Sequence, residues 1–117
     1  MQVIIKNKSK RIKIRNVKKL SEFGKATGLM FHCREKCPAM LFEFKKSTRM
    51  SIHSLFVFFP FAAVWTDDKN NIIDKKIVNP FRLSISCKKP FYNLVEIPLN
   101  KNYYKEINSL FKKSNYS

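Results

Sequence analysis

The sequence predicts a small, mainly β fold of the α+β class, with a short helix before Gly28 and a helix at the C-terminus. Three observations predict it. Short runs of β-branched and aromatic residues recur with polar turns between them, as in a β-sandwich or an open-barrel-like domain. The chain has 117 residues, the size of one domain, and 44% of them are hydrophobic, enough for one packed core. We therefore expect residues 1–117 to form a single domain.

Two strands, at 2–6 and 11–17, are the first predicted elements, and the polar segment NKSK between them predicts a β-hairpin. In the second run Ile12 and Ile14 alternate with basic residues, which is the pattern of a half-buried strand. The same alternation places Val17 on the face opposite Ile12. Apolar residues then recur at helical spacing in 18–31, so a short helix is expected there.

Further strands are expected at 39–44, at 51–66 with a bend or break at Pro60, at 72–78 and at 93–99. The segment DDKNN at 67–71 is the strongest turn signal and predicts a second hairpin. In the last strand Leu94, Glu96 and Pro98 share one face, and Val95, Ile97 and Leu99 share the other.

A final helix is expected from about 101 to 113, with Asn100 as its cap. Its apolar stripe consists of Tyr103, Ile107, Leu110 and Phe111. Residues 100–117 are therefore predicted to form a C-terminal helix and tail.

Three segments in order resemble a known family. They are GLMF at 28–31 followed by MLF at 40–42, SIHSLFVFFP at 51–60 with Asp67 beyond it, and LVEIPL at 94–99. Together they resemble the prokaryotic family called domain of unknown function 192, in its short archaeal form, over residues 28–99. The resemblance implies a compact β-sandwich-like core with short helices. It implies no reaction, because none is established for the family.

The formal net charge of +16 comes from 24 Lys and Arg against 8 Asp and Glu. One interpretation is attraction to a polyanion such as nucleic acid, through a sequence-independent contact on the N-terminal hairpin. The residues for that contact are Lys6, Lys8, Lys10, Arg11, Lys13 and Arg15. The other interpretation is codon bias, because Lys, Asn, Ile, Phe and Tyr are residues of AT-rich codons and together fill 55 positions. Arg, the residue that best contacts phosphates and bases in a bidentate manner, is scarce.

No secretory signal is visible at the N-terminus, and the longest apolar run, residues 55–65, is shorter than the roughly 20 residues that span a bilayer. We therefore expect a cytoplasmic protein without membrane insertion. Three cysteines, an odd number, fit free thiols in a reducing compartment.

The segment HCREKC at 32–37 contains zinc-type ligands, with His53 and Cys87 as distant candidates. The spacing of its two cysteines is only loosely zinc-like, and no second close pair exists. We therefore expect free loop thiols, no metal and no cofactor.

His53 is the best single candidate for a small-ligand site, because it lies in the segment that best matches the family, on the same strand face as Ser51. Because the strand around it is otherwise apolar, His53 can instead be a structural histidine that bonds to the backbone. Glu96 is a further candidate: it either faces solvent, the arrangement we favour, or is buried against a basic partner such as Arg82. No catalytic set is predicted. The aromatic residues of 56–65 are expected in the core rather than on a nucleic-acid surface.

The function that these observations favour is a non-enzymatic binding or accessory module. The alternatives are a nucleic-acid-associated protein that uses the basic hairpin, and a ligand-binding or enzymatic site around His53.

Overall fold

A computed structural model describes residues 1–8, 10–20, 33–52, 57–82 and 84–111 of the chain. It contains two open sheets, a two-stranded one of order β1-β2 and a five-stranded one of order β3-β4-β7-β5-β6. The fold is therefore mainly β with open sheets rather than a closed barrel. The elements are β1 Val3–Asn7, β2 Lys10–Ile14, β3 Val17–Leu20, a short 3-10 helix Arg34–Lys36, β4 Ala39–Thr48, β5 Phe61–Thr66, β6 Ile72–Val78, β7 Phe91–Pro98 and α1 Tyr104–Phe111.

The five-stranded sheet is the centre of the molecule, and β7 is its middle strand. β3 pairs with β4 in parallel, whereas β4, β7, β5 and β6 pair with their neighbours in antiparallel fashion. Both faces of β7 are covered, so its side chains alternate between two apolar clusters. Val95 and Ile97 belong to one cluster and Leu94 to the other, which confirms the two faces predicted for this strand.

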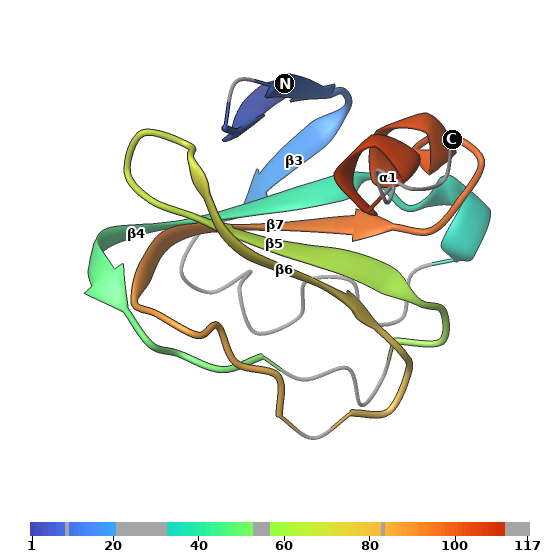
Figure 1. Cartoon of the computed structure of the whole chain (residues 1–117). Helices are drawn as coiled ribbons and strands as arrows, with labels where there is room; N and C mark the ends of the chain where they lie inside the picture. The colour runs from blue at the N-terminus through green and yellow to red at the C-terminus, as the bar shows by residue number, and fades with distance from the viewer. Residues whose placement is uncertain (9, 21–32, 53–56, 83, 112–117) are drawn as a thin grey trace.

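The β1–β2 hairpin and α1 cover one face of this sheet (Figure 1). Ile5, Ile12 and Ile14 of the hairpin are 5% exposed or less and lie in one cluster with the sheet residues of this face. Ile107 and Leu110 of α1 join the same cluster. Burying each such aliphatic side chain stabilises the fold by about 1.5–3 kcal/mol, so apolar packing fixes the helix beside the hairpin.

The opposite face of the sheet carries the larger aromatic cluster. Trp65, Phe61 and Phe91 are fully buried there, and the rings of Trp65 and Phe91 meet edge to face with centroids 6.3 Å apart. The long connections after β4 and after β6 run below this face (Figure 1). They are tied to each other by a pair of backbone hydrogen bonds between Ile52 and Ile85.

The predicted N-terminal hairpin is confirmed, with Val3 opposite Ile14 and Asn7 opposite Lys10. The second strand is shorter than predicted, because Asn16 has a φ of 54° and breaks it. Val17 consequently returns to the same core cluster as Ile12 and is 3% exposed, so the prediction that it faces the other way is wrong.

The helix predicted in 18–31 is wrong for residues 18–20, because these pair in parallel with β4 as part of β3. The rest of that predicted helix, including its end before Gly28, lies outside the described residues. The strand predicted at 51–59 is also not formed in the described residues there. Only Ile52 makes a bridge, and Val57–Phe59 precede β5 without pairing in a sheet.

The second hairpin is confirmed, with β5 and β6 joined by the DDKNN turn. One carboxylate oxygen of Asp67 accepts hydrogen bonds from the backbone N–H groups of Lys69 and Asn71, at 2.8 and 2.9 Å. These bonds hold the pKa of Asp67 below its usual value, although the largest single influence, partial burial, acts in the opposite direction. The C-terminal helix is confirmed as Tyr104–Phe111, and Tyr103, Ile107 and Leu110 of its predicted apolar stripe are buried.

Candidate functional site

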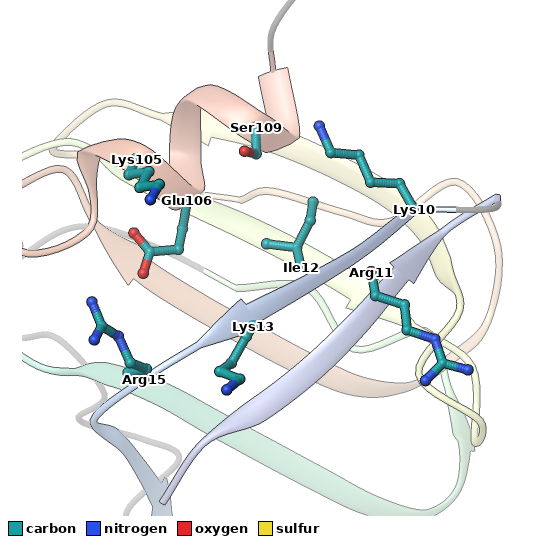
Figure 2. A pocket seen from close by; sticks show the side chains of 8 residues that line it. All are labelled: Lys10, Arg11, Ile12, Lys13, Arg15, Lys105, Glu106 and Ser109. Carbon is teal, nitrogen blue, oxygen red and sulfur yellow. The ribbon is translucent and has the colours of Figure 1, made fainter.

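A groove of about 360 Å³ lies between β2 and α1 and is lined mostly by basic residues (Figure 2). Residues from the two elements form opposite walls. They are Lys10, Arg11, Ile12, Lys13 and Arg15 on the hairpin side and Lys105, Glu106 and Ser109 on the helix side. We call this surface the basic groove.

The alternation of β2 explains why its cations are available to the groove. Ile12 and Ile14 point into the core, so the basic residues that flank them are left exposed. On the helix side, Ile107 and Leu110 anchor α1 on the core, which leaves Lys105 exposed at the groove. Lys10 and Arg15 point toward the helix, whereas Arg11 and Lys13 point away from it on the outer side of the hairpin (Figure 2).

The charge of the groove is strongly unbalanced. Five cations line it against the single carboxylate of Glu106. The ion pairs of the described residues lie elsewhere, between Lys19 and Glu43 at 2.8 Å and between Arg34 and Glu35 at 3.9 Å. Because no acid occurs in residues 1–17, the hairpin has no neutralising partner of its own. Such a surface attracts anions.

The structure brings four of the six hairpin residues predicted to bind a polyanion into the groove. Lys10, Arg11, Lys13 and Arg15 line it. Lys6 lies on β1, where its backbone N–H donates to the carbonyl oxygen of Asn70, and Lys8 lies in the hairpin turn with a φ of 58°. Neither lines the groove.

The helix side of the groove was missed by sequence reasoning. Lys105, Glu106 and Ser109 come from a helix almost a hundred residues away from the hairpin in sequence. These residues lie outside the apolar stripe predicted for the helix, but no pattern in the sequence indicates that this polar face meets the hairpin.

The other predicted site is not assembled in the described residues. His53 lies outside them. Ser51 is exposed in the connection after β4, whereas Glu96 is only 6% exposed in the middle of the sheet. The described part of the chain contains no hydrogen bond between these two side chains.

Glu96 is a buried acid, so the prediction that it faces solvent is wrong. It lies in β7 between Met40 of β4 and Ala63 of β5. Burial raises the pKa of Glu96 to about 8, and the described residues show no ion pair or hydrogen bond to its carboxyl group, including none from Arg82. Glu96 lies on the face predicted from the alternation of the strand, but both faces of the sheet are covered, so its side chain has no access to water.

The thiol of Cys37 lies near Glu96. Burial and, to a smaller extent, the charge of Glu96 raise the pKa of Cys37 to about 12, so this thiol stays protonated at neutral pH. Cys87 is also buried and Cys33 is exposed, and all three thiols are free. The described residues contain no group of three or more metal-ligating side chains, and the two histidines of the zinc hypothesis lie outside them.

Fold and groove together define a small, mainly β domain with a concave basic surface between β2 and α1. The chain belongs to the DUF192 family, described as "Uncharacterized ACR", whose sequence pattern matches residues 3–108. This confirms the family resemblance and extends it from residues 28–99 to the hairpin and α1. No curated protein matches the chain.

Two solved structures are similar to this fold. One is a protein of unknown function from Novosphingobium aromaticivorans, with a TM-score of 0.69, 14% identity, and coverage of 90% of this chain and 76% of that one. The other is described as a proposed transcription regulator from Sinorhizobium meliloti, with a TM-score of 0.66, 16% identity, and coverage of 87% and 81%. At these identities the similarity concerns the fold. In the part of the chain that is described, no helix is long and apolar enough to cross a membrane.

Proposed function

We propose that this protein is a non-enzymatic binding module that holds a polyanion of the nucleic-acid class in the basic groove. The observation that carries the proposal is that four hairpin cations and Lys105 line one groove with a single acid. The proposal also takes the chain to act in the cytoplasm as one domain over residues 1–117.

The chemistry of the groove suits phosphates better than it suits a reaction. Lys and Arg donate charge-assisted hydrogen bonds to phosphate oxygens, and the hydroxyl of Ser109 can add a neutral one. Most of these cations are Lys, which contacts a phosphate as a point charge and does not read bases. The expected binding is therefore electrostatic and independent of sequence.

The arrangement also bears on codon bias as the origin of the charge. Base composition would scatter lysines over the surface, whereas here cations from two distant segments line one groove. The similar fold of the Sinorhizobium protein, described as a proposed transcription regulator, is consistent with a nucleic-acid partner.

The test compares two variants that lose the same charge. In the groove variant, four groove residues are neutralised: Lys10→Gln, Arg11→Gln, Lys13→Gln and Arg15→Gln. In the surface variant, four exposed lysines outside the groove are neutralised: Lys18→Gln, Lys36→Gln, Lys46→Gln and Lys101→Gln.

Binding of labelled duplex DNA is measured by fluorescence anisotropy from about 20 to 200 mM salt. We expect the groove variant to bind at least about tenfold more weakly at low salt. The slope of log K against log salt concentration should become shallower by roughly 0.9 for each phosphate contact removed. The surface variant should stay close to the wild type. Equal losses in the two variants would reject the groove as the site, and no binding by the wild type at low salt would reject the function.

A further inference from the structure

Two exposed phenylalanines that do not line the basic groove form a ring pair. Phe58 precedes β5 and Phe81 follows β6, and they are 58% and 60% exposed. Their ring centroids are 5.7 Å apart, with planes at 67°. Phe is among the residues most often buried, so a pair of exposed rings in contact needs an explanation. We call Phe58 and Phe81 the aromatic pair.

The backbone at Phe81 is unfavourable for the residue it carries. Phe81 has a φ of 66° in a turn directly after Pro80. A bulky side chain is a true outlier in this region, which glycine occupies without penalty. Such outliers gather at functional sites, and an exposed ring gains little from the core to offset this one.

A small basic pocket of about 150 Å³ lies next to the aromatic pair along the chain. Its lining includes the exposed edge of β6 and the segment after Phe81, namely Lys76, Ile77, Val78, Arg82, Ser84, Ile85 and Ser86. It contains two cations, two serines and no acid. Lys76 is held in place, because its ammonium donates to the carbonyl oxygen of Ser86 and lies 5.5 Å from the centre of the Trp65 ring. We call this the serine pocket.

We propose that the aromatic pair and the serine pocket bind one nucleotide of a single-stranded nucleic acid, with the base stacked on the rings and the phosphate in the pocket. Every base offers a π face that stacks on an aromatic ring, and cations beside the ring take the backbone charge. In a duplex these base faces are covered by neighbouring base pairs. The aromatic pair therefore selects unpaired strands, whereas the basic groove attracts any polyanion.

This inference rests on the proposed function for the class of partner and adds the form of nucleic acid that is preferred. Phe58 also corrects the expectation that the aromatic residues of 56–65 belong to the core. That expectation is confirmed for Phe59, Phe61 and Trp65, which are buried, and is wrong for Phe58. Phe56 lies outside the described residues.

The test uses the full chain, a labelled oligothymidine of about twelve nucleotides and a duplex of the same length, at about 50 mM salt. Three variants are compared with the wild type: Phe58→Ala with Phe81→Ala, Phe81→Gly, and Met50→Ala. Met50→Ala is the matched control, because Met50 is an apolar residue with 47% exposure outside both surfaces.

We expect the double alanine variant to bind the single strand about tenfold or more weakly and the duplex unchanged, while Met50→Ala changes neither. Phe81→Gly should show the same selective loss with no lower melting temperature, because glycine accepts the positive φ. This variant separates loss of the ring from loss of folding.

The outcomes distinguish the two proposals. If the groove variant loses binding to both forms while the aromatic variants bind like the wild type, the groove function stands and the single-strand inference is overturned. If the wild type binds neither form, both fail. If a poly-glutamate peptide binds and its binding depends on the aromatic pair while that of the single strand does not, the partner is an acidic protein and the inference is overturned.

Discussion

Glu96 places an ionisable group in the middle of the central sheet, next to the buried thiol of Cys37. Glu96 is 6% exposed, and burial raises the pKa of its carboxyl group to about 8 from an ordinary value of 4.5. The folded protein therefore keeps this proton over a range of pH in which the unfolded chain has already lost it.

The stability of the protein should consequently fall as the pH rises from about 5 to about 8. Below pH 4.5 the folded and the unfolded state both carry the proton, so Glu96 adds no pH dependence. Above pH 4.5 only the folded state binds the proton, so each further pH unit lowers the free energy of unfolding. This effect ends near pH 8, where the carboxyl group of the folded protein also ionises. At about 1.4 kcal/mol per pKa unit, the full effect is on the order of 5 kcal/mol.

Urea unfolding at several pH values measures this for the wild type and for Glu96→Gln. The Gln variant should lose most of the slope over this range and be the more stable protein at pH 8. Asp68→Asn, in an exposed turn, is the control and should keep the slope. A wild type whose stability is flat between pH 5 and 8 would show that Glu96 is ionised at neutral pH in the folded state.

Glu96 and Phe58 show why single residues were harder to predict than strands. Alternation placed Glu96 correctly with Leu94, but it cannot tell whether a second layer covers that face. The cover comes from the irregular connections after β4 and β6, which have no period to read. Phe58 lies in the same apolar run as Phe59, yet Phe58 is exposed and Phe59 is buried. Both residues precede β5 without pairing in a sheet, so no strand alternation in the sequence distinguishes them.

Tyr103 joins three elements at the end of the groove. Its hydroxyl donates to the carbonyl oxygen of Asn16, between β2 and β3, and accepts from the backbone N–H of Ala39 at the start of β4, both at 2.9 Å. Tyr103 is 2% exposed, and its hydrogen bond from Ala39 is buried, whereas its hydrogen bond to Asn16 is part-buried. The bend between the two sheets and the start of α1 are thus fixed by one oxygen atom.

Removing that oxygen should destabilise the protein markedly. Tyr103→Phe leaves the buried N–H of Ala39 and the part-buried carbonyl of Asn16 without their partner, at a cost of about 1–3 kcal/mol in the free energy of unfolding. Tyr104→Phe is the matched control, because the neighbouring tyrosine is 45% exposed and the same atom is removed. Chemical denaturation of both variants measures the difference, and equal stabilities would mean that the two hydrogen bonds contribute nothing net.

Elements with local signals were predicted well, and those set by distant pairing were not. The hairpins are readable because Asp67 and its neighbours form a turn by their own side-chain hydrogen bonds. β3 was not readable, because the helical spacing of 18–31 conflicts with its pairing to β4, whose partner residues lie 22 positions further along the chain. The hairpin wall of the groove follows from alternation in β2, while its helix wall depends on tertiary packing of Ile107 and Leu110.

The net charge of +16 is carried by a molecule with a radius of gyration of only 13.3 Å. Like charges at this density repel one another and favour expansion of the chain. The repulsion should be greatest at the basic groove, where cations from β2 and α1 converge and only Glu106 opposes them. Salt, which reduces the Debye length to about 10 Å at 0.1 M, screens it.

Salt should therefore stabilise the folded protein, and the groove should account for more of the effect than its share of the charge. We expect the melting temperature of the wild type to rise by roughly 4 °C between about 20 and 300 mM NaCl, equivalent to about 1 kcal/mol. The groove variant and the surface variant each lose four positive charges, so net charge alone predicts the same reduced rise for both. If repulsion is concentrated where β2 meets α1, the melting temperature of the groove variant rises clearly less with salt than that of the surface variant. The groove variant is then also the more stable of the two at low salt. Calorimetry of the three proteins measures this, and equal rises in the two variants would show that the charge acts as a uniform field over the surface rather than at the groove.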